Sequence, residues 1–339
     1  MRAAVLERPG RISVRDVPVP EPAEGEVLVR VRAALTCGTD LKAFQRGHAL
    51  IPMPGPFGHE YAGVVAAAGK GVRKFRTGDA VMGVHSAPCL RCPTCAKKQF
   101  NLCEDLMTTK VLGSFAEYLL IPGRIVRQNL FPKPAHLPFA EAAFLEPLAC
   151  VVHGMEPLRV ARGDTALIIG AGPIGLLHLM LAKARGARVI LTGLEKHRLK
   201  TGRRLGADAA CAPDILPAVV ERMTGGLGVD HVFECTGQPA VWEESVNYVR
   251  RGGTVVLFGG CRHGATVTFD AGRLHYDEIT LRGTFHFTPA DVRKAYRLLR
   301  DRAVNVKPLI SGACGLDELP AVFRRLGRGE GIKFAVLPS

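Results

Sequence analysis

A cluster of cysteines in the first half of the chain has the spacing of metal ligands. It consists of Cys89, Cys92, Cys95 and Cys103. Four thiolates at such short separations can surround one ion, as in a closed structural zinc site. An iron–sulfur cluster also takes closely spaced cysteines and is the alternative. A zinc ion there would hold a loop together without taking part in a reaction.

A second set of candidate metal ligands is dispersed over the same half of the chain. It comprises Cys37, His59, Glu60 and Glu146, the first three in segments that contain glycine. Each has a simpler interpretation by itself, since a lone cysteine is usually a small buried hydrophobe. Together, a thiolate, an imidazole and a carboxylate that leave one position open form a catalytic zinc site. The sequence does not decide which glutamate would bind the metal directly.

The segment Gly170-Ala-Gly172-Pro173-Ile174-Gly175 fits the dinucleotide-binding pattern Gly-x-Gly-x-x-Gly. It follows an apolar run and opens a helix-length segment, which is the context that this motif requires. The first glycine permits a tight turn, the second lets the backbone approach a pyrophosphate, and the third lets helix and strand pack closely. We therefore expect this segment to bind a dinucleotide, with the helix N-terminus facing the phosphates.

The choice between NAD and NADP depends on the end of the next strand. An acidic residue there would hold the ribose hydroxyls of NAD. Gly193 occupies that position, and Lys196, His197 and Arg198 follow shortly after. The missing carboxylate and the positive charges favour NADP. Glu195 lies two residues beyond the expected position, so NAD stays an alternative.

Strand-like and helix-like segments alternate in the second half of the chain. Apolar runs at 165–170, 187–192, 230–235 and 254–258 are separated by helix-length segments. Such alternation predicts an α/β fold with a doubly wound parallel sheet of the Rossmann type. The first half instead carries short apolar runs bounded by turn residues, which predicts a β-rich domain.

Composition limits the classes of protein. The chain has 339 residues, of which 47% are hydrophobic and 22% charged, as in ordinary globular proteins. No apolar run is long enough for a membrane span, and the N-terminus lacks the apolar core of a signal peptide, so a cytoplasmic location is expected. Cysteines in that reducing compartment favour metal binding over disulfides. The formal net charge of +14 comes from scattered residues, which argues against a nucleic-acid partner.

Several segments together resemble one family, the zinc-dependent medium-chain dehydrogenases, and within it the branch of sorbitol and threonine dehydrogenases. The resemblance covers essentially the whole chain. It rests on Cys37-Gly-Thr-Asp40, Gly58-His-Glu60, the four clustered cysteines, Glu146-Pro-Leu148, residues 170–175 and Gly283-Thr-Phe-His286.

This resemblance implies a domain organisation and a metal content. A β-rich, GroES-like catalytic domain with a partly open barrel would occupy residues 1–150, and a Rossmann domain residues 151–284. Residues 285–339, with helical segments at 289–300 and 316–326, would return to the catalytic domain. The resemblance also favours zinc at the four cysteines and a second, catalytic zinc ion, which gives two per chain.

The reaction implied by the resemblance is the reversible oxidation of a secondary alcohol to a ketone, with hydride transfer to NADP or NAD. The substrate would be a small polyol, sugar alcohol or amino alcohol. Thr39 matches the hydroxyl of the family's proton relay. Lys42 stands where the next relay member is often histidine, and His48 is a candidate substitute.

The same resemblance implies further contacts with the cofactor and the substrate, and an oligomeric state. Thr236 and Phe258 would lie against the cofactor, and Lys333 would meet its pyrophosphate. Phe57, Phe285 and His286 are candidates for the substrate pocket, with core packing as the simpler interpretation of the aromatic residues. A homotetramer is preferred to a dimer.

Two other functions fit parts of the sequence. A zinc-free enone or quinone reductase of the same superfamily would share the fold, but Cys37, His59 and the clustered cysteines argue against it. A noncatalytic zinc protein that binds nucleic acid would account for the charge, and its DNA binding would depend on salt. It would leave the glycine motif unexplained.

Overall fold

The computed structural model describes residues 1–338 and divides them into two compact units. Unit 1 joins Met1–Ala149 to the chain from Phe287 onward, and unit 2 is the continuous segment Cys150–His286. The division falls within helix α5 (Leu145–Met155). Each unit has a hydrophobic core of its own.

Unit 1 is built mainly of β-strands. The larger sheet has the strand order β15-β16-β3-β5-β6-β8, with β7 also paired to β3, and a smaller sheet has the order β2-β1-β4. The strands are β1 (Arg2–Arg8), β2 (Arg11–Asp16), β3 (Val27–Leu35), β4 (Gly55–Pro56), β5 (Glu60–Ala68), β6 (Ala80–Gly83), β7 (Tyr118–Ile121), β8 (Leu130–Pro132), β15 (Ile310–Cys314) and β16 (Lys333–Val336). The helices are α1 (Gly38–Arg46), α2 (Pro93–Ala96), η1 (Phe100–Leu102), α3 (Gly123–Gln128), α4 (Phe139–Ala142), the first part of α5, α11 (Pro289–Arg300), η4 (Lys307–Leu309) and α12 (Leu319–Gly327).

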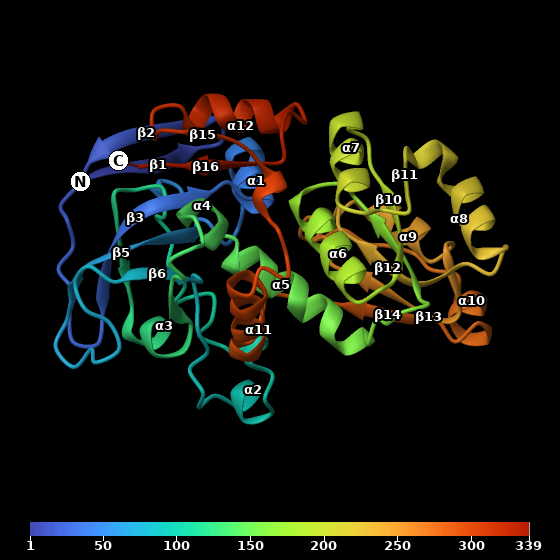
Figure 1. Cartoon of the computed structure of the whole chain (residues 1–339), viewed down its shortest axis with the longest axis horizontal. Helices are drawn as coiled ribbons and strands as arrows, with labels where there is room; N and C mark the ends of the chain where they lie inside the picture. Colours follow the sequence, from blue (N-terminus) through green and yellow to red (C-terminus); the bar gives the residue numbers. More distant parts are fainter. Residues whose placement is uncertain (339) are drawn as a thin grey trace. The chain divides into compact units, whose positions relative to one another are not determined.

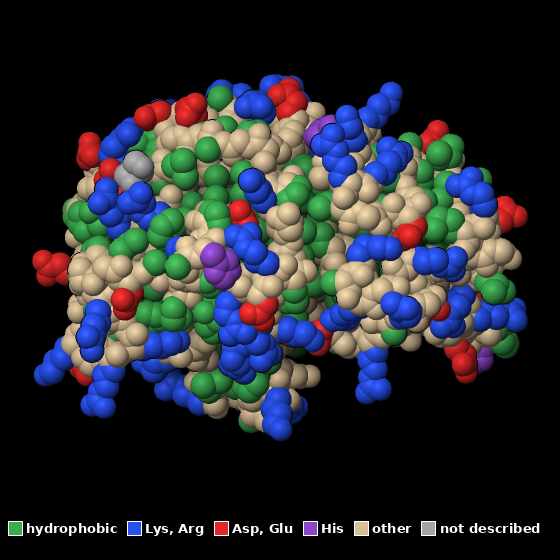
Figure 2. Space-filling model, viewed as in Figure 1, with side chains coloured by type: hydrophobic (Ala, Val, Ile, Leu, Met, Phe, Trp, Pro, Cys, Tyr) green, Lys and Arg blue, Asp and Glu red, His purple; other side chains and the backbone are tan. Residues whose placement is uncertain are grey.

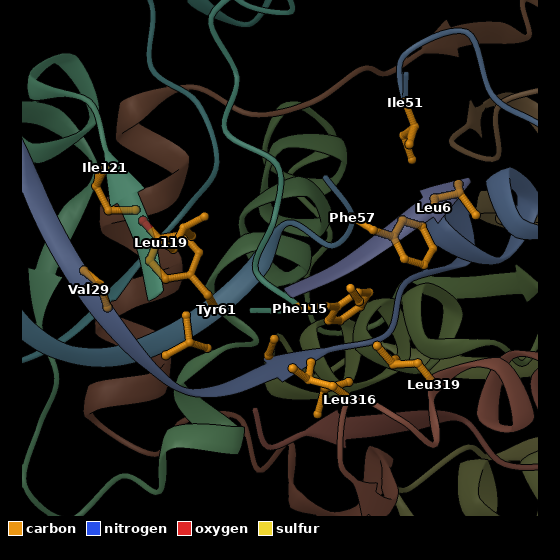
Figure 3. Packing of buried hydrophobic residues seen from close by; sticks show 14 of the residues in the cluster. Leu6, Val29, Ile51, Phe57, Tyr61, Phe115, Leu119, Ile121, Leu316 and Leu319 are labelled. Carbon is orange, nitrogen blue, oxygen red and sulfur yellow. The ribbon is translucent and has the colours of Figure 1, made fainter. Parts of the chain in front are cut away.

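Strand β3 organises unit 1 because it pairs with β5, β7 and β16. Its apolar side chains are buried, whereas Arg30 and Arg32 are exposed, as expected for a strand that alternates along part of its length. The core next to it contains Phe57 and Phe115 (Figure 3), whose ring centroids are 5.3 Å apart. The ring of Phe57 also lies 5.2 Å from that of Phe323. Phe57 is therefore a core residue of unit 1.

Unit 2 is a six-stranded, fully parallel sheet with the order β11-β10-β9-β12-β13-β14 (Figure 1). The strands are β9 (Thr165–Ile169), β10 (Arg188–Thr192), β11 (Ala209–Cys211), β12 (Val229–Glu234), β13 (Val249–Leu257) and β14 (Thr280–Gly283). The helices are η2 (Glu156–Leu158), α6 (Pro173–Ala184), α7 (Lys196–Arg204), η3 (Pro213–Ile215), α8 (Leu216–Thr224), α9 (Pro239–Ser245) and α10 (Ala271–Tyr276). In chain order these strands run 3-2-1-4-5-6, which is the order of Rossmann folds.

That strand order confirms the predicted fold class and locates a binding crevice. In open parallel sheets, ligands bind beyond the carboxyl ends of the strands where the order reverses. Here the reversal lies between β9 and β12, so the segments that follow Ile169 and Glu234 are the expected site.

The distribution of surface charge and the character of the helices are relevant to binding of nucleic acids and membranes. Lys and Arg side chains are spread over the face shown in Figure 2, with Asp and Glu among them. Within residues 1–338, no helix combines the length and the apolar character needed to cross a bilayer.

Candidate functional site

The pairing of β3 with β5 brings Cys37 and His59 together. Leu35, at the end of β3, is the register partner of Glu60, at the start of the antiparallel strand β5. Cys37 lies two residues beyond Leu35 and is the N-cap of α1. As a result, the ligand atoms of Cys37, His59 and Glu60 all lie within 4.8 Å of one another.

Asp40 contacts both Cys37 and His59. Its Oδ2 accepts the backbone N–H of Cys37 at 3.2 Å, which holds the start of α1. Its Oδ1 lies 3.1 Å from Nδ1 of His59, and the Asp40 side chain is fully buried. An imidazole that donates from Nδ1 presents the lone pair of Nε2, which is the form that binds metal. Asp40 therefore orients His59 as a candidate ligand.

Lys333, from β16, holds Glu60. Its Nζ donates to both carboxylate oxygens of Glu60, at 2.7 and 2.6 Å, and to the backbone oxygen of Thr36 at 2.6 Å. Both side chains are almost completely buried. Burial raises the pKa of the Glu60 carboxyl to about 7, although Lys333 opposes this shift. The sequence placed Lys333 at a pyrophosphate; that role stays a prediction, and the contact present here is an ion pair with Glu60.

Glu146, the fourth predicted residue, lies in the first turn of α5. Its Oε1 is 3.4 Å from Nδ1 of His85, a residue that the sequence did not single out. The ring of His85 in turn packs edge-on against the ring of His59, with centroids 5.1 Å apart. Unit 1 thus brings Cys37, His59 and Glu60 within reach of one ion. Glu146 lies outside this group of three, beside His85.

The residues of this site fit a zinc ion by their chemistry. One thiol, one imidazole and two carboxyl groups are donors that zinc prefers. The surroundings favour positive charge: burial lowers the pKa of His59, yet Asp40 and Cys37 outweigh burial and raise that pKa well above its usual value. Cys37, His59 and Glu60 are also close enough to share one ion.

The four-cysteine loop, Cys89–Cys103, fits a second zinc ion. Its sulfur atoms lie within 4.8 Å of one another, with Cys89 to Cys95 at 4.0 Å and Cys92 to Cys103 at 3.9 Å. A tetrahedron with zinc–sulfur bonds of about 2.3 Å has edges of about 3.8 Å. All four cysteines are free thiols. The backbone N–H groups of Cys89 and Cys92 point at sulfur atoms of the group, at 3.2 and 3.3 Å, and would stabilise thiolates.

The glycine motif forms the turn between β9 and α6. Gly170 has φ +109°, a conformation that side chains disfavour. A Cβ on Gly175 would lie 1.8 Å from the carbonyl oxygen of Gly170, so only glycine lets α6 pack this closely. A Cβ on Gly172 would meet no atom within 4 Å. The space beside Gly172, the N-cap of α6, is therefore open. Pro173 and Ile174 begin that helix, and their contact with a phosphate group stays a prediction.

Glu234 shapes the neighbouring edge of the same crevice. This buried carboxylate ends β12 and accepts the backbone N–H groups of Thr236 at 2.7 Å and Gly237 at 3.2 Å. Its backbone oxygen accepts the N–H of Phe258 at 3.0 Å and that of Gly259 at 2.8 Å. Glu234 thereby ties together the two loops that carry the predicted cofactor contacts, Thr236 and Phe258.

The end of β10 has no room for the acidic residue of NAD-binding sites. A Cβ on Gly193 would lie 2.6 Å from Cβ of Ala171, within the glycine motif. Glu195 is the N-cap of α7 and lies 3.5 Å from Arg198, while Lys196 is exposed.

The proton-relay residues follow Cys37 on α1. Thr39 is half-buried in the first turn, and Lys42 lies one turn further on. His48 lies beyond the end of α1, where its Nδ1 accepts the backbone N–H of Leu50 at 3.2 Å. Burial, with Lys42 and Arg46 nearby, lowers the pKa of His48.

Sequence reasoning missed the roles of Asp40, His85 and Glu234. Asp40 had a usable signal, since an acidic residue three positions after a helix N-cap is a capping pattern. Glu234 had a weaker one, as a carboxylate that ends an apolar strand. Nothing local marks His85, because its partners Glu146 and His59 are distant in sequence.

Comparison with known proteins gives consistent matches. Residues 23–134 match the family model of the alcohol dehydrogenase GroES-like domain, and residues 173–301 match that of the zinc-binding dehydrogenases. A sorbitol dehydrogenase of Halalkalibacterium halodurans is 30% identical over 97% of this chain and 96% of its own. A D-arabitol-phosphate dehydrogenase of Enterococcus avium is 32% identical over 99% and 97%.

A solved structure agrees with these matches. It is of a protein from Sinorhizobium meliloti 1021 that is described as a zinc-binding dehydrogenase and is bound to NADP. It superimposes with a TM-score of 0.90 and 35% identity over 99% of both chains. The matches confirm the predicted resemblance and the prediction of an oxidoreductase that uses zinc and NAD or NADP. This chain belongs to the zinc-binding dehydrogenases of the alcohol dehydrogenase family.

Proposed function

We propose that this protein oxidises a secondary hydroxyl group of a polyol or polyol phosphate to a ketone, reversibly and with a preference for NADP. The observation that carries this proposal is the cluster of Cys37, His59 and Glu60 in unit 1, with Glu146 nearby beside His85. Two carboxyl groups in a zinc site suit a polar substrate with several hydroxyls. The sorbitol and D-arabitol-phosphate dehydrogenases among the relatives support this substrate class.

The metal and the dinucleotide supply the reactive chemistry when bound. Zinc acts as a Lewis acid that lowers the pKa of an alcohol hydroxyl, and the nicotinamide ring accepts a hydride. The residues that would hold zinc are Cys37 and His59, with Glu60 or Glu146. The residues of this chain would bind and orient the substrate and the cofactor, and they would move the proton.

Asp40 and Lys333 preorganise the site for this reaction. Asp40 keeps His59 in one tautomer, and Lys333 keeps Glu60 in one position. Thr39 is the residue in α1 whose hydroxyl could take the proton of the substrate and pass it on. In unit 2, the glycine motif and the N–H groups at the start of α6 bind the pyrophosphate.

The preference for NADP follows from the charges at the end of β10. No carboxylate stands at Gly193 to repel a 2′-phosphate, and the first turn of α7 carries Lys196, His197 and Arg198. The solved relative bound to NADP supports the same preference. Glu195 opposes it, but this carboxylate is paired with Arg198.

The test is a panel of polyols, polyol phosphates and simple secondary alcohols, each followed at 340 nm with NAD and with NADP, together with the zinc content. We expect two zinc ions per chain and turnover of polyols, faster with NADP. Cys37→Ser should lose one zinc ion and the activity, whereas Cys314→Ala, at a buried free cysteine in β15, should keep both.

Two outcomes would overturn this proposal. Turnover of simple alcohols alone would remove the polyol substrate, and a chain without zinc at Cys37 would remove the catalytic metal. The homotetramer and the cytoplasmic location stay predictions from the sequence, and sedimentation velocity would test the former.

A further inference from the structure

We propose that Glu234 is a positioning residue for the nicotinamide half of the bound dinucleotide. Glu234 ends β12 and contacts two loops that follow neighbouring strands of the sheet. These are the β12 loop (residues 235–238) and the β13 loop (residues 258–260). The proposed role concerns how the cofactor is held, so it does not depend on which alcohol is oxidised.

The strand order assigns the two halves of a dinucleotide to opposite sides of β9. In Rossmann folds the pyrophosphate lies at the glycine motif, here between β9 and α6, and the adenosine ribose lies at the end of the second strand, here β10. In the sheet, β10 and β12 flank β9 on opposite sides. The nicotinamide half therefore extends toward β12, where the β12 loop and the β13 loop lie.

The side chain of Glu234 holds the β12 loop. Its Oε1 accepts the backbone N–H of Thr236 at 2.7 Å and the hydroxyl of the same residue. The backbone N–H of Gly237 lies 3.2 Å from both carboxylate oxygens. Glu234 is fully buried, and burial raises the pKa of its carboxyl group, whereas these hydrogen bonds favour the charged form. The loop thus supplies the donors that a buried carboxylate requires.

The backbone of Glu234 holds the β13 loop. Its carbonyl oxygen accepts the N–H groups of Phe258 at 3.0 Å and of Gly259 at 2.8 Å. The carbonyl oxygen of Gly259 in turn accepts the indole N–H of Trp242, from α9, at 3.0 Å. Glu234 is therefore hydrogen-bonded to both loops, to one through its side chain and to the other through its main chain.

The two loops also pack against each other without space for a side chain. A Cβ on Gly259 would lie 2.2 Å from the backbone nitrogen of Gly237 and 2.9 Å from Oε2 of Glu234. A Cβ on Gly237 would lie 2.5 Å from the carbonyl oxygen of Gly260, and the φ of +70° at Gly237 favours glycine. A shift of the Glu234 carboxylate would therefore move both loops, together with the predicted cofactor contacts that they carry.

Glu234→Gln tests this role because it keeps the size of the side chain. Its amide group replaces one acceptor oxygen by an NH2 donor, which cannot accept an N–H of the β12 loop. The measurements are the dissociation constants of NADPH and of 2′,5′-ADP, taken with the full-length, zinc-loaded protein. NADPH occupies both halves of the crevice, whereas 2′,5′-ADP contains only the adenosine half. Glu244→Gln is the matched control, because Glu244 is an exposed carboxylate of α9 that accepts the hydroxyl of Tyr248.

We expect Glu234→Gln to weaken NADPH binding about 10-fold, as for the loss of one hydrogen bond to a charged group, and to leave 2′,5′-ADP binding unchanged. Glu244→Gln should bind both ligands as the wild type does. The difference between the ligands separates positioning from a general loosening of unit 2, which would weaken both. Unchanged NADPH affinity, or an equal loss for the two ligands, would overturn the assignment.

Trp242→Phe gives a second test that leaves the carboxylate in place. It removes the hydrogen bond to Gly259 and should loosen only the β13 loop. We expect it to weaken NADPH binding about 3-fold and to leave 2′,5′-ADP binding unchanged. If circular dichroism shows that Glu234→Gln does not fold, this variant decides, and wild-type affinity for NADPH would then contradict the positioning role.

Failure of the proposed function would look different, because no alcohol takes part in these titrations. A lack of polyol turnover would leave the difference between NADPH and 2′,5′-ADP intact. If the wild type binds NADH more tightly than NADPH, the NADP preference is wrong, and NADH and ADP then serve as the two ligands.

Discussion

Lys333 and Glu60 form a buried ion pair whose two members depend on each other. Replacing Lys333 by Met would leave the carboxylate buried without a counter-charge. Breaking a buried pair in this way costs about 3–5 kcal/mol. We expect Lys333→Met to lower the free energy of unfolding of the metal-free protein by that amount in urea titrations.

The double variant Lys333→Met/Glu60→Gln is the control for this prediction. It removes both charges, so most of the lost stability should return. A single variant as stable as the wild type would show that Glu60 is protonated in the folded state and needs no partner.

His178 gives a prediction for the dependence of stability on pH. It is fully buried in α6, its Nδ1 lies 3.0 Å from the carbonyl oxygen of Ile174, and burial lowers its pKa to about 4. The rings of Phe233 and Phe258 pack against it, and the Cys235 thiol that also faces it has a raised pKa and stays neutral.

The sign of this effect follows from the two pKa values of His178. Between its unfolded value of about 6.5 and about 4, the unfolded chain binds a proton that the folded chain does not. The contribution of neutral His178 to the free energy of unfolding is therefore fully present above pH 6.5. It falls by about 3 kcal/mol as the pH drops to 4. Denaturation of His178→Leu across this range should show a shallower decline, and parallel curves for the two proteins would contradict the prediction.

At the level of single residues, the sequence predicted which side chains belong to the candidate site better than it predicted which residues they contact. Cys37, His59, Glu60 and Glu146 were predicted as metal ligands because few residue types bind metals, and that role stays a prediction. The contacts of Lys333 with Glu60 and of His85 with Glu146 were not predicted, because they join residues far apart in the chain. Such pairs depend on strand pairing that no local pattern encodes.

Among the elements, the turn between β9 and α6 offers a matched pair of substitutions. Gly175→Ala places a methyl group 1.8 Å from the Gly170 oxygen and should push α6 away from β9, which lowers both the thermal midpoint and dinucleotide affinity. Gly172→Ala meets no atom of the protein, so it should keep the midpoint and weaken only cofactor binding.

Thermal scans and fluorescence titrations with NADPH measure these two effects. If Gly172→Ala binds the cofactor as tightly as the wild type, the pyrophosphate does not approach this part of the backbone. If Gly175→Ala keeps the wild-type midpoint, the helix is free to move.

Helices and strands whose apolar residues recur with a clear periodicity were predictable from the sequence. The helix expected at 289–300 is α11 (Pro289–Arg300), and the run at 165–170 is β9. Irregular parts are harder to predict: the chain from 139 to 155 forms two separate helices, α4 and α5. The turns between short strands of unit 1 also follow tertiary contacts more than local sequence.

For the whole molecule, the two units differ in how they are assembled from the chain. Unit 2 is continuous and contains all six strands of its sheet, so residues 150–286 alone should fold and bind NADPH. Residues 1–149 alone lack β16, which pairs with β3 and carries Lys333, and they should stay largely unfolded. Circular dichroism and cofactor titration of the two fragments test this. A cooperative unfolding transition for 1–149 would show that β16 is dispensable.

The contact of Lys333 with Glu60 also has a consequence for synthesis of the protein in the cell. The two residues are 273 positions apart, and all of unit 2 lies between them. During translation, the ribosome therefore completes unit 2 before Lys333, the counter-ion of Glu60, has been synthesised. We expect zinc to enter the catalytic site of a nascent chain late, after translation has passed β16.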